Sequence, residues 1–338
     1  MRSRAVLLPT PCDPFLLKYW IDNFKKYYKN EVDKLYVHIN SSVEKSVIEY
    51  IQEMLDEVGA SYIYKNIQVQ HGDCLNELLE MCTEEYVMLV EDDSYVFEKG
   101  NINECFEMVE SGKVDCVVGK RGSCAIEILE RASDLWGIDY NGEGDQGCNF
   151  WPNMFFSKRE TLLKTDRNFC AKQWNAGDYI PALDYTMKET GCGDTFVNTS
   201  LQLRAMNLRF HYENQYHASP FDIKDYEEKK NLWDGKASWV HIGSLSSGLS
   251  GMLVDDNQVP LVDRLTGKPR PIELPASIPD EWARRIQMWQ TFYDNSNPEK
   301  IPEFREEYRK AVDRLYRICG VNPKTVKRRQ AMYKELGL

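Results

Sequence analysis

YVMLVEDDSYVF, residues 86–97, places five apolar residues directly before three acids. The apolar run Tyr86–Val90 is short and partly β-branched, which is typical of a buried strand in a parallel sheet. Glu91, Asp92 and Asp93 then stand at the carboxyl end of that strand, where open α/β sheets bind their ligands. Adjacent carboxylates repel one another, and a divalent cation relieves this repulsion because hard cations prefer oxygen ligands. The alternative is a solvated turn, and the motifs in the rest of the chain are needed to choose between a cation site and such a turn.

Strand and helix patterns alternate three times before this stretch. Because such alternation folds into a right-handed, largely parallel sheet with helices on its faces, we expect an α/β fold with Tyr86–Val90 as the fourth strand. A helix starting at Cys74 would be capped by Asp73. Strands are expected over residues 5–9, 35–39, 61–64 and 86–90, and helices over residues 15–28, 43–58 and 74–81.

The pattern weakens after Phe97. We expect residues 120–150 to form a polar loop, followed by an aromatic block, an apolar-periodic segment over 196–208 and a strand-like run from Trp239. Five of the 14 prolines lie between Gly251 and Asp280. This distribution predicts a core domain over residues 1–250, a proline-rich strap or linker over 251–280, and a basic helical extension over 281–338.

Charge and cysteine content narrow the classes of function. The net charge of −11 argues against a general nucleic-acid coat, although residues 281–338 carry 13 Lys and Arg against 8 Asp and Glu. A basic tail is a weak indication of a polyanionic partner, and its alternative is a solvated helix surface. The ten cysteines form no CxxC pair, so a zinc site is not indicated. With no secretory signal and no apolar stretch near ~18 residues, we expect a reducing, cytoplasmic location and no membrane contact.

The order of the motifs resembles glycosyltransferases of the GT-A fold. The features in question are the acids after a strand, the later Gly193-Asp194 before a helix, and the late His241. In that fold a DxD motif holds a divalent metal on the diphosphate of a nucleotide sugar. The resemblance therefore implies Mn²⁺ or Mg²⁺ held by Asp93, Glu91 and His241, Asp92 beside the donor, and a UDP-sugar as that donor. His211 and His217 are rivals of His241, which could also be a core histidine.

Two further segments resemble the large inverting family of this fold. Residues 71–76 resemble the segment in which a Gly and an Asn line the nucleotide, which implies Gly72 and Asn76. Residues 193–204 resemble the family's Gly-Glu-Asp block, whose acid is the catalytic base; this role carries over to Asp194, although Gly193 replaces the usual Glu. An ordinary helix cap at Asp194 and a retaining mechanism without a strong base are the alternatives.

Residues at the ends of the first two strands complete the predicted donor site. Thr10 and Asp13 follow the first strand and Asn40 follows the second, where a nucleotide base would lie in such a sheet. Trp151 and Phe150 are candidates for an acceptor platform, with core packing as their alternative.

The acceptor is indicated by two short stretches. Residues 8–15 and 31–37 resemble viral glycosyltransferases that modify hydroxymethylated pyrimidines in DNA, including those associated with TET/JBP-type oxygenases. This resemblance favours 5-hydroxymethylpyrimidine in DNA as the acceptor and, for a viral protein, the host cytoplasm as its location. The alternatives are a glycan or protein hydroxyl, a binding module without activity, and a nucleotidyltransferase. The last would carry a Gly-rich loop with a Lys after the first strand, which residues 10–14 lack.

Overall fold

The structure is a computed structural model. It describes residues 2–10, 14–40, 45–65, 69–92, 94–96, 99–119, 124–138, 150–213, 215–217 and 239–241. Asp13 and Asp93 lie outside the described residues, and so do the predicted strap over 251–280 and the predicted helical extension over 281–338.

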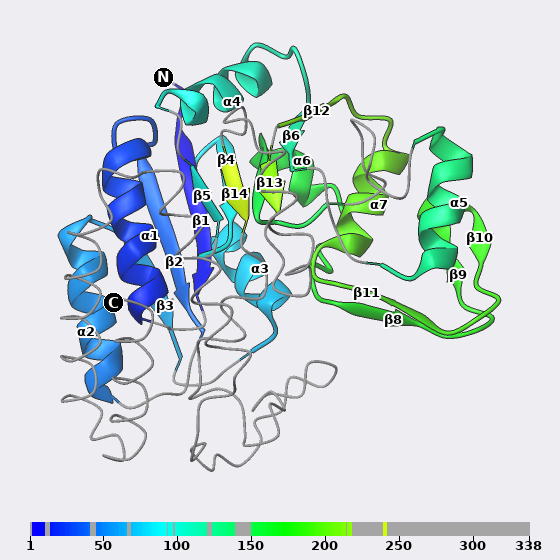
Figure 1. The fold of residues 1–338 in the computed structure, drawn as a ribbon, viewed down its shortest axis with the longest axis horizontal. Helices are drawn as coiled ribbons and strands as arrows, with labels where there is room; N and C mark the ends of the chain where they lie inside the picture. The colour runs from blue at the N-terminus through cyan, green and yellow to red at the C-terminus, as the bar shows by residue number, and fades with distance from the viewer. Residues whose placement is uncertain are drawn as a thin grey trace, which may run out of the picture.

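A seven-stranded sheet forms the centre of the molecule (Figure 1). Its order is β12-β6-β7-β4-β1-β2-β3, and β7 runs antiparallel to both of its neighbours while the other pairs are parallel. The predicted α/β fold with a mostly parallel sheet is therefore confirmed. The strands are β1 (Arg4–Thr10), β2 (Lys34–Ile39), β3 (Ser61–Tyr64), β4 (Tyr86–Val90), β6 (Cys116–Val118), β7 (Met154–Lys158) and β12 (Phe210–Tyr212).

Helices cover both faces of this sheet, because successive strand residues point to opposite faces. Met88 belongs to the apolar cluster that includes α1 (Pro14–Tyr27), α2 (Lys45–Glu57) and α4 (Asn101–Glu110). Its neighbour Leu89 belongs to a second cluster with α3 (His71–Met81), α6 (Arg159–Leu163) and α7 (Val197–Ala205). All five residues of β4 are buried, as expected for a strand covered on both sides.

The start of α3 differs from the prediction. The helix begins at His71 rather than Cys74, and the Gln70 carbonyl accepts hydrogen bonds from the Asp73 and Cys74 amides at 3.0 and 3.2 Å. Asp73 therefore lies inside the first turn and does not cap it.

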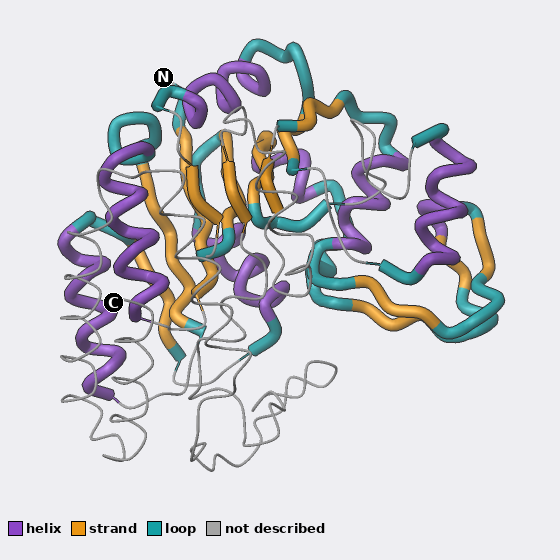
Figure 2. The backbone as a smooth tube through the Cα atoms, viewed as in Figure 1, coloured by secondary structure: helices purple, strands orange, loops and turns teal. Residues whose placement is uncertain are grey.

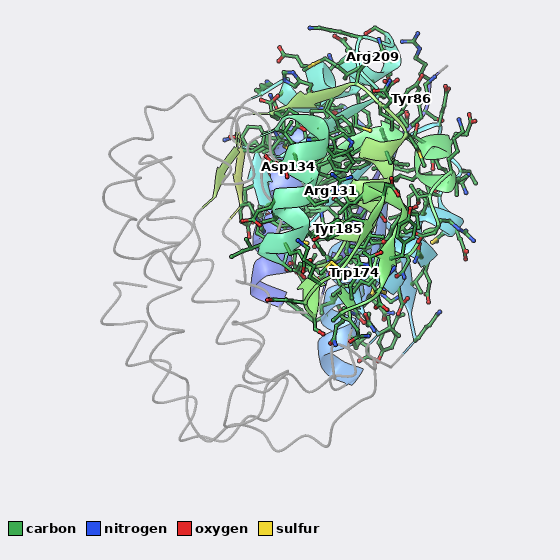
Figure 3. All side chains as sticks on the ribbon, turned by 90° about the vertical axis from the view of Figure 1, so that its right-hand side faces the viewer. Tyr86, Arg131, Asp134, Trp174, Tyr185 and Arg209 are labelled. Atoms are coloured by element: carbon green, nitrogen blue, oxygen red, sulfur yellow. The ribbon has the colours of Figure 1, made fainter. Side chains whose placement is uncertain are left out.

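A smaller unit lies beside the sheet (Figure 2). It contains α5 (Ile126–Trp136), the antiparallel pair β8 (Lys172–Trp174) and β11 (Gly191–Gly193), and the antiparallel pair β9 (Tyr179–Ile180) and β10 (Tyr185–Thr186), with the short helix η1 (Pro181–Leu183) between the last two strands. The predicted loop over 120–150 is thus wrong for residues 126–136. Ile128 and Ala132 stand one turn apart and are fully buried in the unit's own apolar cluster, which favours a helix. Figure 3 shows the outer side of this unit, where the guanidinium of Arg131 lies 5.8 Å from the centre of the Tyr185 ring.

A second, three-stranded sheet follows from the residues after the acids. Strand β5 (Ser94–Val96) pairs antiparallel with β14 (Trp239–His241), and β14 pairs parallel with β13 (Gln215–His217). Two segments far apart in the sequence therefore meet directly after β4. Within the described ranges, no helix has the length and hydropathy of a membrane span.

Candidate functional site

The Glu91 carboxylate lies between two imidazoles at the carboxyl end of β4. Its Oε2 is 3.2 Å from His241 Nε2, and its Oε1 is 3.7 Å from His71 Nδ1. The His241 side chain is only 5% exposed, whereas Glu91 and His71 are 20% and 31% exposed. The three side chains therefore form a polar cluster that is partly exposed to solvent, and His241 is its most buried member.

Strand pairing brings His241 to this place. His241 stands opposite Ser94 across the antiparallel β5–β14 pair, so both side chains lie on the same face. The Trp151 ring meets the His241 ring at 5.5 Å between centroids and 65° between planes. Of the rival histidines, His217 is aligned with His241 in the β13–β14 pair, and His211 Nε2 lies 3.3 Å from Glu213 Oε2. Neither rival has a contact with Glu91 among the described interactions.

Asp92 turns into the protein rather than toward Glu91. Its residue is 2% exposed, and its Oδ2 accepts a 2.8 Å hydrogen bond from Thr10 Oγ1 at the end of β1. The Tyr95 hydroxyl donates to the Asp92 carbonyl oxygen at 3.0 Å. Thr10 and Asp92 thus join the ends of neighbouring strands and shape the edge of the site.

Asn40 shapes the same edge one strand further along. Its Nδ2 donates to the Val69 carbonyl at 2.9 Å, and its Oδ1 accepts from the Val69 amide at 2.8 Å. Its own amide donates to the Thr10 carbonyl at 2.8 Å. The Asn40 side chain therefore fixes the segment that leads into α3.

The first turn of α3 is packed without a gap against residues 169–170. A Cβ on Gly72 would lie 2.2 Å from the Cys170 amide nitrogen, so only glycine fits there. Cys170 Sγ donates to Asp73 Oδ1 at 3.3 Å, and burial raises the pKa of this thiol to about 12. One turn further along, Asn76 Oδ1 is buried and has no hydrogen-bond partner among the described residues.

Asp194 follows β11 and precedes α7. Its Oδ1 accepts the Thr195 amide at 2.8 Å and its carbonyl accepts the Val197 amide at 3.1 Å, while its side chain stays exposed. The Phe196 amide donates to the Phe169 carbonyl at 2.7 Å. Since residues 169–170 also pack against Gly72, the segment of Asp194 and the start of α3 share one support.

The two aromatic candidates fall in different surroundings. Phe150 is fully buried, with its ring stacked 5.7 Å from Phe155 and two more rings, Phe196 and Phe210, within 6.2 Å. No face of Phe150 is open to stack on a base, whereas Trp151 is half-buried against His241.

The donor atoms for a cation are a carboxylate and an imidazole. No group of three His, Cys, Asp or Glu side chains that could hold a metal ion occurs in the described part of the chain. Glu91 and His241 supply two such side chains 3.2 Å apart, and Asp93, two residues after Glu91, lies outside the described part. An oxygen–nitrogen pair of this kind fits Mn²⁺ better than Mg²⁺, because Mg²⁺ prefers oxygen ligands, and a third ligand is required.

The contact of His71 with Glu91 was not predicted from the sequence. The signal was present in the order of elements. A helix that directly precedes β4 in a parallel sheet begins at the same edge at which β4 ends, so its first residues lie close to Glu91.

No protein-family model and no curated protein sequence matches the chain. Among solved structures, the chain is similar to the mannosyltransferase PcManGT of Pyrobaculum calidifontis, in complex with GDP-Man and Mn²⁺, at 17% identity over 48% of this chain and 47% of that one, with a TM-score of 0.37. Residues 1–349 of TarS from S. aureus match at 10% identity over 91% of this chain and 80% of that one, with a TM-score of 0.41. Mouse xyloside xylosyltransferase 1 matches at 8% identity over 71% and 97%, with a TM-score of 0.40. The chain thus spans about half of the mannosyltransferase, and at these identities and TM-scores the similarities establish neither its family nor its activity.

Proposed function

We propose that this protein is a metal-dependent glycosyltransferase that moves a sugar from a nucleotide sugar to a hydroxyl group. The observation that carries the proposal is the 3.2 Å contact between Glu91 and His241 directly after β4. The order of motifs implies that a late histidine joins the acids after the fourth strand, and β14 places His241 opposite Ser94. A solvated turn at residues 91–93 would not require a buried histidine next to Glu91.

Asp93, Glu91 and His241 are the proposed metal ligands. A divalent cation would neutralise the negative charge that develops on a diphosphate leaving group. His241 is buried and held by two strands, so it offers its nitrogen in a fixed position. Glu91 is the more exposed partner and reaches the same point from the end of β4.

The donor would lie along the edge formed by β1, β2 and the start of α3. Thr10, Asn40 and Asp92 hold this edge together, and Asp13 continues it in sequence. Gly72 lets the first turn of α3 pack directly against residues 169–170. The buried Asn76 Oδ1 would accept a hydrogen bond from the nucleotide.

Asp194 is the proposed general base. An acceptor hydroxyl is a weak nucleophile, and a carboxylate within ~3 Å takes its proton as attack proceeds. The Asp194 side chain is exposed and uses Oδ1 on the Thr195 amide, which leaves Oδ2 for the acceptor in the described surroundings. A base in this role predicts inversion at the anomeric carbon.

The acceptor we propose is a 5-hydroxymethylpyrimidine in DNA. Support comes from the resemblance of residues 8–15 and 31–37 to enzymes of that kind, and from the aromatic ring of Trp151 beside His241, on which a base turned out of the duplex could stack. The hairpin region 172–194 carries two lysines against four acids, so the phosphate backbone would have to be held elsewhere, for which the basic residues of 281–338 are the candidates.

The test of the donor reaction is release of nucleoside diphosphate from a panel of UDP-, GDP- and other nucleotide sugars, with Mn²⁺ or with EDTA. We expect release from one donor with Mn²⁺ only, and its loss in Asp93→Asn. Asp134→Asn removes an exposed carboxylate from α5 and serves as the charge-matched control, which should keep full activity. Activity that survives EDTA or Asp93→Asn would disprove the metal assignment.

The acceptor is tested separately by following radiolabelled sugar into hydroxymethylated duplex DNA, unmodified duplex, a glycan mixture and a protein mixture. Label in the hydroxymethylated duplex alone supports the proposal, and label in glycan or protein replaces it with the rival acceptor. Asp194→Asn should lower turnover by about 100-fold or more with any acceptor. Unchanged turnover would show that the base assignment is wrong.

A further inference from the structure

A buried polar network contacts the Trp239 side chain of strand β14, two residues before His241. The Trp239 indole Nε1 donates to Asn101 Oδ1, and Asn101 Nδ2 donates to Glu213 Oε1 at 3.2 Å. The Cys105 thiol lies 3.7 Å from Asn101 Oδ1 and 4.0 Å from Glu213 Oε2. Trp239 is fully buried, and Asn101 and Glu213 are 4% and 9% exposed. The network joins α4, the end of β12 and β14.

This network fixes Trp239, which belongs to the main apolar cluster. The Trp239 ring packs edge-on against Tyr28 at 6.2 Å and against Phe156 at 6.3 Å. A buried indole N–H is costly without an acceptor, so the ring takes the position in which Asn101 meets it. When the Asn101 amide oxygen accepts from Trp239, its NH₂ group faces the Glu213 carboxylate and donates to it, so the two contacts together fix the orientation of the amide.

Trp239 and His241 are two residues apart in one strand and so lie on the same face. They stand opposite Val96 and Ser94 of β5. A slip of β14 by one residue would turn both side chains to the other face, which would remove His241 from Glu91 and the indole from Asn101 together. β14 is only three residues long and pairs with short strands, so its ladder alone specifies the register weakly.

We infer that Asn101 and Glu213 are positioning residues for His241. Through the indole N–H of Trp239 they fix the register of β14 on β5 and thereby hold the His241 imidazole against Glu91. The inference rests on the proposed function where it concerns metal binding, and on the described contacts where it concerns the place of β14.

The first test compares two buried tryptophans. Trp239→Phe removes the indole N–H and keeps an aromatic ring in the core. Trp20→Phe makes the same change at another fully buried tryptophan, whose Nε1 has no hydrogen-bond partner among the described residues. We expect Trp239→Phe to weaken Mn²⁺ binding about 10-fold, measured by electron paramagnetic resonance of free Mn²⁺, and Trp20→Phe to leave it unchanged. Equal affinities in the two variants would overturn the inference.

The second test exchanges donor and acceptor within the network. Asn101→Asp places two carboxylates face to face and should weaken Mn²⁺ binding. Adding Glu213→Gln restores a donor opposite the new carboxylate, which still accepts from Trp239, so the double variant should recover most of the affinity. A purely space-filling role predicts no such recovery. Thermal unfolding of each variant, followed by circular dichroism, confirms that the comparison is between folded proteins.

The third test asks whether the effect runs through His241 and whether it survives failure of the proposed function. In a His241→Ala background, Trp239→Phe should cause no further loss of Mn²⁺ affinity, and a further loss of equal size would contradict the inference. Hydrogen exchange of the residue 239–241 amides gives a readout that needs no metal. Faster exchange in Trp239→Phe than in Trp20→Phe supports the positioning role even if the wild-type protein binds no Mn²⁺, an outcome that would disprove only the metal assignment. Equal exchange would disprove the positioning role itself.

Discussion

The hydrogen bond between Asp92 and Thr10 distinguishes Asp92 from its neighbour Glu91. Glu91 faces the histidines, whereas Asp92 is buried and accepts the Thr10 hydroxyl at 2.8 Å. A buried carboxylate is tolerated because charge-assisted hydrogen bonds replace water. Glu91 and Asp92 are therefore not equivalent, although they are neighbours in the sequence.

Replacement of Thr10 tests this bond. Thr10→Val keeps the shape of the side chain and removes the donor to Asp92, so the free energy of unfolding should fall by about 1–3 kcal/mol. Thr10→Ser keeps the hydroxyl and should cost clearly less. Urea denaturation of the three proteins at pH 7 measures the differences. Equal losses in Val and Ser would show that the hydroxyl bond to Asp92 contributes no more to stability than the methyl group that serine lacks.

A second residue, His38, predicts a pH dependence. Its side chain is 1% exposed, its Nε2 lies 3.1 Å from Glu77 Oε2, and burial lowers its pKa below the ordinary 6.5. Below pH 6.5 the unfolded chain therefore binds a proton that folded His38 resists. Its contribution to stability is present above about pH 6.5 and is lost as the pH falls toward the lowered value.

The variant His38→Gln isolates this contribution, because glutamine can still bond to Glu77 and does not titrate. Denaturation at pH 7, 6 and 5 should show that the wild-type protein loses more stability than the variant between pH 7 and 5. Parallel loss in the two proteins would show that His38 is not the group responsible.

At the scale of elements, an ion pair ties β1 to α4. Arg4 Nε and Nη2 donate to the two oxygens of Glu110 at 2.6 and 3.0 Å, and Arg4 Nη1 donates to Asn103 Oδ1 at 2.8 Å. The side chains are only 16% and 6% exposed. The Arg4 guanidinium lowers the pKa of Glu110, and the Glu110 carboxylate raises the pKa of Arg4. A bidentate pair of this kind orients the helix on the first strand.

Glu110→Gln should lower the free energy of unfolding by about 1.5–3 kcal/mol at pH 7. The difference should shrink as the pH falls through the lowered pKa of Glu110, because the wild-type carboxyl is then protonated as well. Glu160→Gln breaks the exposed pair with Lys164 and is the matched control, with no measurable loss expected. A similar loss in both variants would show that the Arg4–Glu110 pair stabilises the fold no more than an exposed ion pair does.

The elements also show what a sequence can reveal. The first four strands of the central sheet were predictable because they are short apolar runs, such as Tyr86–Val90, whose five residues are all buried. The strands over 172–193 were not, since two or three residues carry almost no periodicity. The meeting of β14 with β5 depends on pairing between distant segments, which local patterns do not encode. His241 was found through the order of motifs, whereas Asn101 and Glu213, which have no motif, were missed.

At the scale of the whole molecule, residues 169–170 connect the sheet, the start of α3 and the segment of Asp194. Gly72 is the point of closest approach, with a hypothetical Cβ 2.3 Å from the Phe169 carbonyl carbon. Because backbone atoms cannot move aside as a flexible side chain does, an added methyl group must displace one of the two segments.

Gly72→Ala should therefore reduce stability by about 1–3 kcal/mol and also weaken binding of a nucleotide sugar. Gly137→Ala is the control: its left-handed φ of 64° makes the change unfavourable, but nothing lies within 4 Å of the added Cβ. We expect this control to lose stability and keep donor binding, both measured by calorimetry. Unchanged donor binding in Gly72→Ala would show that the packing of α3 against residues 169–170 does not affect the donor site.

The antiparallel direction of β7 brings two separate connections of the chain to the same end of the sheet. Met154, the first residue of β7, is aligned with Val90, the last residue of β4. One chain segment leaves the sheet where another enters it, so Glu91 and Trp151 flank the same spot although they belong to separate connections. If β7 ran parallel to β4, Trp151 would lie at the opposite end of the strands, far from Glu91. Trp151 and Glu91 therefore approach His241 from two separate connections, and in the proposed function one would serve the acceptor and the other the cation.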